Sequence, residues 1–250
     1  MGRPLWRACL IALTGFSATA RAADVQVAVA ANFAGPFQKI ASDFAAATGH
    51  KAIAISGSTG KFFTQIKEGA PFEVLLAADD EAPRKLEEEG LSVKGQRFTY
   101  AKGKLVLWSA MPGYVDNHGA VLKAGSFTRL AMANPRLAPY GAAALTSLKA
   151  LGLFDALQPK IVQGDNIAQT QQFVATGNAE LGFVALSQVQ VPGKTAIGSW
   201  WVIPSSLYSP LLQDAVLLKK GQANPAAAAL LSYLKSEQAQ AVIRAYGYEL

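Results

Sequence analysis

The sequence is poor in the side chains that most enzymes use. Its 250 residues include one cysteine, Cys9, and two histidines, His50 and His118. Protein zinc sites are built mainly from these two residue types at short, regular spacings, and no such spacing occurs here. No nucleophile elbow or zinc-protease motif is present either. We therefore expect no catalytic residues, and a Ser-His-Asp arrangement assembled only by folding is the enzymatic alternative.

Charge and long apolar runs are also scarce. Charged residues make up 16% of the chain, and the formal net charge is +6. Leaving out Arg3, Arg7 and Arg21 lowers the basic residues from 23 to 20, against 17 acidic residues. The remaining excess is small and forms no arginine-rich stripe, so we expect no nucleic-acid partner. No run after residue 22 has the length needed to cross a membrane, and we expect no insertion.

Residues 1–22 have the features of a secretory signal peptide. Arg3 and Arg7 precede the apolar stretch ACLIALTGFSATA, and Ala20-Arg21-Ala22 is a small-x-small cleavage site. A buried N-terminal helix is the alternative. Cleavage near Ala22 would remove Cys9, so the exported chain would have no disulfide and would depend on an ordinary hydrophobic core.

Strand-like and helix-like patterns alternate along the rest of the chain. Period-2 and continuous apolar runs predict strands, and apolar residues three or four apart predict helices. Such alternation is typical of an α/β fold with mostly parallel sheets, and two successive blocks of it suggest two lobes. The predicted strands are 24–31, 51–56, 72–78, 98–109, 129–133, 160–163, 180–186, 199–204 and 208–220. The predicted helices are 36–49, 60–70, 79–90, 141–152, 166–177 and 224–247.

The stretch SGSTGK, residues 56–61, resembles part of a phosphate-binding loop. A true P-loop would need glycine where Ile55 stands and a hydroxyl residue at Phe62, so the match fails twice. Small polar residues nevertheless occupy four strand-to-helix junctions. These are Asn32, Ser58-Thr59, the NPRLAPYG segment before Gly141, and the QGDN segment before Ile167.

Helix N-termini at the carboxyl ends of strands favour anions without any cation. Four such junctions in two lobes could therefore meet at one anion site between the lobes. The alternative is that Asn32, Thr59 and Asn166 are simple helix caps.

These residues resemble the periplasmic molybdate-binding proteins of ABC transporters. The likeness extends from VAVAANFAGPFQKIASDF, through SGSTGKFFTQIKEGAPFEVLLAADD, FTYAKGKLVLWS, ANPRLAPYGAAA and GDNIAQTQQFVATGNAELGFVALSQV, to the tail AVIRAYGYEL. It implies a periplasmic, monomeric, two-lobed binding protein that closes over one molybdate or tungstate dianion. Its partner would be the membrane permease of an ABC transporter, and it would have no cofactor. The expected lobes are residues 23–101 with 208–250, and residues 102–207.

The resemblance also implies the residues that hold the oxyanion, through backbone N–H groups and neutral side-chain donors. The first loop would contribute Ala31 and Asn32, including the Asn32 amide, and the second Ser58 and Thr59. Tyr140 would contribute from the other lobe, and Ile167 would give its backbone N–H. One branch of the family has a tyrosine where Ala185 stands, and this chain lacks that hydroxyl.

A site made only of donors would choose among oxyanions. Monohydrogen phosphate carries a proton that needs an acceptor, and leaving it unpaired costs about 1–3 kcal/mol. Sulfate is fully ionised but smaller than molybdate, whereas tungstate has nearly the same size. A site for sulfate, phosphate or an organic acid is the alternative, with Arg136 or Asp165 as the residue that such ligands would use. We expect Lys61 to point into solvent.

Two other features have plain structural explanations. Glu87, Glu88 and Glu89 fit a solvated helix face better than an acid–base pair. Trp200 and Trp201 could stack on a sugar, but alternation along a strand places at least one of them in the core.

Overall fold

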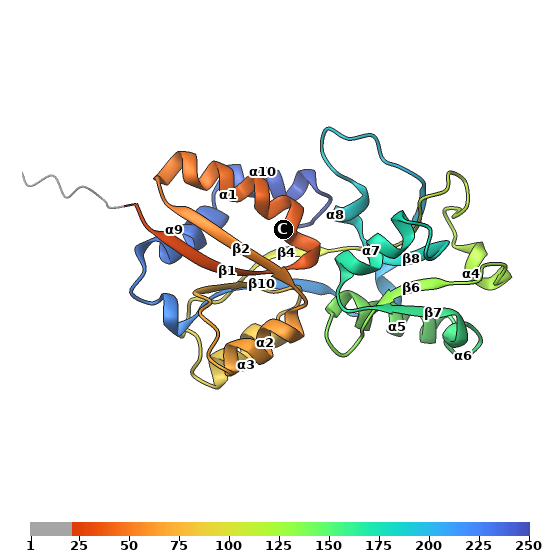
Figure 1. Ribbon diagram of the computed structural model, residues 1–250, viewed down its shortest axis with the longest axis horizontal. Coiled ribbons are helices and arrows are strands. Elements are labelled where there is room, and N and C mark those ends of the chain that lie inside the picture. Colours follow the sequence, from red (N-terminus) through yellow and green to blue (C-terminus); the bar gives the residue numbers. More distant parts are fainter. Residues whose placement is uncertain (1–21) are drawn as a thin grey trace, which may run out of the picture.

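The computed structural model describes residues 22–250 and shows two α/β lobes side by side along the long axis (Figure 1). Each lobe is built on a five-stranded sheet, with strand orders β2-β1-β3-β10-β4 and β7-β6-β8-β5-β9. The predicted signal peptide lies outside the described residues except for Ala22. None of the helices in residues 22–250 combines the length and the apolar character that a membrane crossing requires.

The first sheet contains the N-terminal strands and one strand from near the C-terminus. Val25, Val27 and Val29 alternate on one face of β1 and contact the core under α1, α9 and α10. Ala28 on the opposite face packs with residues of α2 and α3, so helices cover both faces (Figure 1). The strands are β1 Asp24–Ala30, β2 Lys51–Gly57, β3 Val74–Leu76, β4 Phe98–Gly103 and β10 Leu211–Leu217. The helices are η1 Ala31–Phe33, α1 Ala34–Thr48, α2 Thr59–Lys67, α3 Glu81–Glu88, η4 Lys219–Gly221, α9 Pro225–Leu234 and α10 Glu237–Ala245.

The second sheet has the same layered arrangement. Leu105 and Leu107 of β5 face the core under α5, whereas Val106 and Trp108 face the core under α7 and α8. The strands are β5 Leu105–Ser109, β6 Leu130–Ala133, β7 Ile161–Gly164, β8 Leu181–Ala185 and β9 Ser199–Val202. The helices are α4 Ala120–Ala124, α5 Pro139–Ala150, α6 Phe154–Leu157, η2 Gln158–Lys160, α7 Ile167–Ala175, α8 Leu186–Val189 and η3 Ser205–Leu207.

Two parts of the predicted fold need correction. Each sheet is mixed rather than mostly parallel, because β10 pairs antiparallel with β3 and β4, and β5 pairs antiparallel with β8 and β9. The single predicted helix 224–247 is two helices, α9 and α10. Ser236 separates them, and its Oγ accepts the Ala239 N–H at 3.3 Å as an N-cap of α10.

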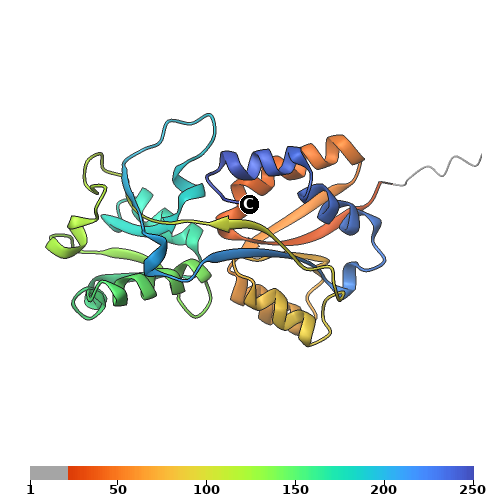
Figure 2. The same cartoon turned by 180° about the vertical axis from the view of Figure 1, so that it is seen from behind.

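The chain crosses between the sheets at two neighbouring places. Only Lys104 separates β4 from β5, and β10 returns to the first sheet beside β4, with Leu211 opposite Gly103 (Figure 2). The predicted β-rich stretch 98–109, which Gly103 interrupts, forms two strands: β4 ends at Gly103 in one sheet, and β5 begins at Leu105 in the other. Two adjacent strands that connect two lobes have the arrangement of a hinge.

Candidate oxyanion site

A small cavity lies between the two lobes where four loops meet. Two of these loops follow β1 and β2 in the first sheet, and two precede α5 and α7 beside the second sheet. Its wall contains alanine, glycine, proline, asparagine, isoleucine, tyrosine, serine and threonine, and no lysine, arginine, aspartate or glutamate. All six residues predicted from the sequence lie in this wall: Ala31, Asn32, Ser58, Thr59, Tyr140 and Ile167.

Each of the four loops brings an unused backbone donor to the cavity wall. The N–H groups of Asn32, Thr59, Tyr140 and Ile167 make no hydrogen bond to any other residue in the range 22–250. The reason is local: all four N–H groups lie in the first turn of a helix, where no preceding carbonyl is in place to accept them. The positive ends of these helix dipoles therefore meet at one small space.

The second loop adds side-chain hydroxyls. The Oγ of Ser58 is one of two buried side-chain polar atoms in the described residues that have no hydrogen-bond partner. The Thr59 hydroxyl oxygen accepts the N–H of Ala78 at 3.0 Å, which leaves the hydroxyl hydrogen of Thr59 available. A buried hydroxyl without a partner is costly, so its presence in the cavity wall points to a ligand that accepts a hydrogen bond.

The Asn32 side chain does not have its predicted role. Its Nδ2 donates to Gln213 Oε1 at 2.9 Å and to the Tyr248 hydroxyl at 3.0 Å, which uses both amide hydrogens. The carbonyl oxygen of Asn32 accepts the Ser187 hydroxyl at 2.9 Å. The contribution that Asn32 can still make to the cavity is its backbone N–H, and the carboxamide instead holds the first loop in place.

The Tyr140 side chain is likewise held away from solvent by other residues. Its hydroxyl accepts Nε2 of Gln213 at 3.0 Å. A Cβ on Gly103 would lie only 2.1 Å from that hydroxyl, so glycine is required there. Burial raises the pKa of Tyr140 well above its usual range, and it raises the pKa of Tyr248 to about 12. Both hydroxyls therefore remain protonated and uncharged at physiological pH.

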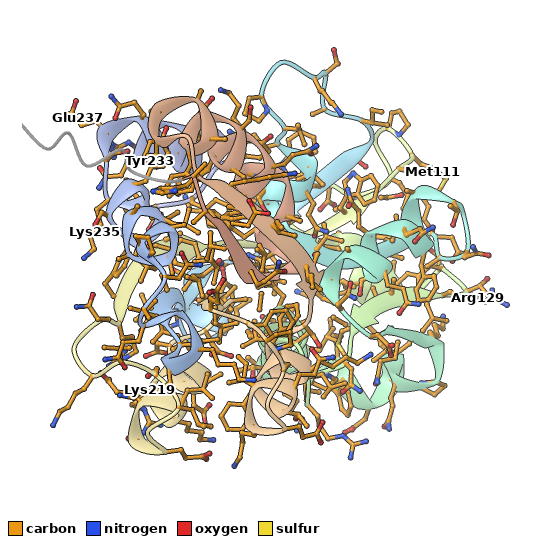
Figure 3. The ribbon with its side chains drawn as sticks, turned by 60° about the vertical axis from the view of Figure 1, so that its left-hand side comes forward. Met111, Arg129, Lys219, Tyr233, Lys235 and Glu237 are labelled. Atoms are coloured by element: carbon orange, nitrogen blue, oxygen red, sulfur yellow. The ribbon has the colours of Figure 1, made fainter. Side chains whose placement is uncertain are left out.

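The charged residues considered from the sequence lie outside the cavity. Lys61 Nζ is 2.7 Å from Asp165 Oδ2, and both side chains are exposed, as expected for Lys61. Arg136 is exposed in the loop before α5. Arg129, Lys219 and Lys235 extend from the outer surface, far from the place where the lobes meet (Figure 3). The cavity thus has donors without formal charges.

The acidic run and the tryptophan pair, which were considered for acid–base chemistry and for sugar stacking, have structural roles. Glu87 binds Arg97 and the N–H of Gly95 on a solvated part of α3. Trp200 and Trp201 are half-buried and pack on opposite faces of the second sheet. Among residues 22–250, no group of three or more histidine, cysteine, aspartate or glutamate side chains is placed to hold a metal ion.

The lobes contact each other around the cavity. The Gly60 N–H on α2 donates to the Leu137 carbonyl at 2.9 Å, which joins the second and third loops directly. Ser187 on α8 bonds to Asn32, and Lys61 pairs with Asp165. These contacts link the lobes on more than one side of the cavity, so the structure is a closed form.

Comparison with known proteins shows the family of the chain. Residues 25–249 match the family described as "Bacterial extracellular solute-binding protein". The chain belongs to this family.

Two of the similar proteins are named for molybdate. The "Molybdate-binding protein ModA" of Azotobacter vinelandii is 62% identical over 231 residues, with 92% of each chain covered. The protein of the same name from Rhodobacter capsulatus is 50% identical, with 96% of this chain and 93% of the relative covered. These relatives confirm the family resemblance that the sequence motifs indicate.

Solved structures of the solute-binding class confirm the two-lobed α/β fold. The Azotobacter vinelandii periplasmic molybdate-binding protein superposes with a TM-score of 0.88 at 42% identity, covering 90% of this chain and 99% of that chain. The sulfate-binding protein SubI from Mycobacterium tuberculosis H37Rv superposes with a TM-score of 0.73 at 11% identity, covering 91% and 86%. At such low identity the second match shows the fold alone.

The sequence alone does not identify three residues that form hydrogen bonds around the cavity. Gln213, Ser187 and Tyr248 form buried hydrogen bonds with Asn32, and Gln213 also binds Tyr140. They come from β10, α8 and the C-terminal tail, far from the cavity loops in sequence. A single hydrogen-bond partner that is distant in the sequence produces no periodic pattern. Of the three, Tyr248 lies in the tail AVIRAYGYEL, which is part of the family resemblance.

Proposed function

We propose that this protein captures molybdate, and equally tungstate, and delivers it to an ABC transporter by closing its two lobes around the dianion. The observation that carries the proposal is the cavity between the lobes. Four unused backbone N–H groups and the unpartnered Ser58 hydroxyl meet there, with no charged side chain in the wall. Molybdate is the cargo in this scheme and is not a cofactor. The names of relatives at 62% and 50% identity support the same ligand.

The donor set accounts for the ligand class. Burying a dianion is unfavourable unless its oxygens are hydrogen-bonded, and hydrogen bonds to a charged acceptor are about twice as strong as neutral ones. A tetrahedral oxyanion offers four oxygens to the four loops. Ala31, Asn32, Ser58, Thr59, Tyr140 and Ile167 are the residues that we assign to the site.

Phosphate and organic acids suit this cavity less well. Asp165, the carboxylate considered as an acceptor for a phosphate proton, is paired with Lys61 outside the cavity wall. Arg136, the guanidinium considered for an organic acid, is exposed and also absent from that wall. Sulfate carries no proton either, so it is the second candidate ligand. Only the size of the anion can distinguish it from molybdate.

An enzymatic function on this scaffold has no support at the cavity. Its wall contains no histidine, lysine or carboxylate that could move a proton. The family and the relatives are binding proteins, and we propose the same class here.

The proposed function also includes a periplasmic location and a division of the chain into two lobes. Residues 1–22 act as a signal peptide, and the exported chain works in the periplasm as a monomer. Residues 23–101 with 208–250 form one lobe and residues 102–207 the other, with the hinge near 100–104 and 205–212. Closure presents both lobes to the membrane permease of the transporter at once.

Isothermal titration calorimetry tests the proposed ligand. We expect molybdate and tungstate to bind within about tenfold of each other, a difference of at most about 1.4 kcal/mol. Sulfate and phosphate should bind more weakly by orders of magnitude. Heat from phosphate equal to that from molybdate would contradict the donor-only site, and tight sulfate binding would reassign the ligand.

A further inference from the structure

Gln213 connects the two walls of the cavity without lining it. This residue of β10 is fully buried, and its amide bonds to one cavity loop from each lobe. Oε1 accepts Nδ2 of Asn32 at 2.9 Å, and Nε2 donates to the Tyr140 hydroxyl at 3.0 Å. Asn32 and Tyr140 are the residues whose free N–H groups lie in the first and third loops.

The pairing of β10 with β4 is irregular beside Gln213. The register shifts between Gln213 and Asp214, because Gln213 lies opposite Ala101 and Asp214 opposite Thr99, so that Tyr100 of β4 is the extra residue. Such bulges redirect a side chain and are common beside functional sites. The Tyr100 hydroxyl on β4 lies 3.2 Å from Gln213 Oε1, which fixes the amide further. The Gln213 side chain is therefore held rigidly by its own sheet.

Size is the property that a donor-only cavity must use to separate molybdate from sulfate. Both are tetrahedral dianions without a proton, so the same donors satisfy both. Discrimination then depends on the distance between the donors of the two lobes. A cavity wall that can move inward would adapt to the smaller sulfate ion. A fixed wall would leave the sulfate oxygens too far from the donor groups to form good hydrogen bonds.

We propose that Gln213 is a positioning residue that determines oxyanion selectivity by fixing the spacing of the Asn32 and Tyr140 loops. This proposal rests on the proposed function, because it concerns the same cavity. Gln213 does not touch the anion. It acts through Asn32 in one lobe and Tyr140 in the other.

Two variants test this assignment, with sodium molybdate and sodium sulfate as the titrants. Gln213→Met keeps the length of the side chain and removes both amide bonds. Tyr140→Phe removes only the hydroxyl that accepts Nε2 of Gln213. Ile243→Val is the control, because Ile243 is fully buried on α10 in the first lobe and does not line the cavity.

The readout is the ratio of the sulfate Kd to the molybdate Kd, measured alongside the Tm of each ligand-free protein. We expect Gln213→Met to lower this ratio at least about tenfold, the order of discrimination that a pocket achieves through size, and Tyr140→Phe to lower it in the same direction. Ile243→Val should lower Tm and leave the ratio unchanged.

The outcomes separate the two proposals. A ratio within about twofold of the wild type in Gln213→Met would show that Gln213 supports stability alone and would overturn the assignment. If that variant does not fold, an unchanged ratio in Tyr140→Phe would overturn it equally. Failure of the wild-type protein to bind molybdate would instead overturn the proposed function, and the role of Gln213 with it.

Discussion

The ammonium group of Lys61 lies 2.7 Å from the carboxylate of Asp165, so that an ion pair joins α2 of one lobe to the loop before α7 of the other. The side chains are 46% and 64% exposed. Exposed pairs of this kind contribute about 0–1 kcal/mol, since water and salt screen them. We therefore expect the lysine in the SGSTGK stretch to act on lobe closure at the surface, since the wall of the proposed anion cavity contains only neutral donors.

We expect Lys61→Ala to weaken molybdate binding by less than about fivefold, with the change mainly in the dissociation rate. The reason is that only a screened pair across the closed lobes is lost. Calorimetry and stopped-flow dissociation would measure both quantities. Lys67→Ala is the matched control, because Lys67 is also on α2 but pairs with Glu89 within the first lobe. Loss of all binding in Lys61→Ala would show that the stretch grips the anion with a cation.

Ser58→Ala should weaken molybdate binding by about 1–3 kcal/mol, or roughly 5- to 150-fold. The Ser58 hydroxyl is buried without a partner in the cavity wall, and an oxygen of the dianion would lose its donor. Calorimetry measures the loss. Ser92→Ala is an unusually close control, since Ser92 Oγ is also buried and unpartnered but lies outside that wall. Equal affinities of the two variants and the wild type would remove Ser58 from the site.

Asn32→Leu separates a positioning role from direct contact. Asn32 donates both amide hydrogens to Gln213 and Tyr248, so the substitution should lower the ligand-free unfolding free energy by about 1–3 kcal/mol. Ser58→Ala, by contrast, removes a buried group that has no partner and should not destabilise the ligand-free protein. Urea unfolding without ligand measures both. Unchanged stability of Asn32→Leu would mean that the carboxamide is free to serve the anion after all.

The sequence is informative about the cavity because its chemistry is local. Free N–H groups occur wherever a helix begins after a strand, and the four junctions with Asn32, Thr59, Tyr140 and Ile167 are visible as short polar segments between periodic runs. Alternation along each strand likewise places Val25, Val27 and Val29 on one face without any tertiary information. Both kinds of feature depend on neighbouring residues only.

The features that the sequence does not reveal are those that depend on distant residues. The direction of the Asn32 carboxamide is decided by Gln213, 181 residues away, and by Tyr248, 216 residues away. The antiparallel pairing of β10 follows from the chain crossing between lobes twice, which local propensity cannot encode. A helix break at Ser236 could have been read from its capping hydroxyl, but the apolar periodicity continues across it.

The half-buried carboxylate of Asp79 should make stability depend on pH. Desolvation raises the pKa of Asp79 to about 6, above its unfolded value of 3.8, and Glu81, Asp80 and Asp214 add to the rise. Above pH 6 the group is ionised in both states, and its burial costs about 1–3 kcal/mol. As pH falls through about 6, the folded state takes up the proton first, so the cost decreases and vanishes near the unfolded pKa.

Asp79→Asn should therefore raise the unfolding free energy at pH 7.5 and leave it nearly unchanged near pH 4. Asparagine can still accept the Ala82 N–H that Asp79 Oδ1 accepts at 2.9 Å, so the cap on α3 is kept. Urea unfolding of both proteins at the two pH values measures the difference. Asp116→Asn is the control, because Asp116 also caps a turn but is exposed. A variant less stable than the wild type at pH 7.5 would contradict the burial argument.

Gly60→Ala should oppose closure while stabilising the open lobe. The Gly60 N–H reaches the Leu137 carbonyl of the other lobe at 2.9 Å, and an added Cβ would lie 2.9 Å from that oxygen and 3.0 Å from Leu137 Cα. Backbone cannot move aside as a flexible side chain can, so the lobes would stay slightly apart, at a cost of about 1–3 kcal/mol. Alanine also favours α2 over glycine by up to about 1 kcal/mol. We therefore expect a higher ligand-free Tm and molybdate binding weaker by roughly 5- to 150-fold.

Small-angle X-ray scattering provides the direct measurement of closure. The radius of gyration of the wild-type protein should decrease when molybdate is added, because the contacts of Gly60, Lys61 and Ser187 form only when the lobes meet. Gly60→Ala should show a smaller decrease at saturating molybdate, whereas the exposed Gln65→Ala on the same helix should behave as the wild type. If Gly60→Ala binds and contracts like the wild type, the Gly60–Leu137 contact does not limit closure. A wild-type radius that stays constant despite tight binding would mean that the lobes are already closed without ligand.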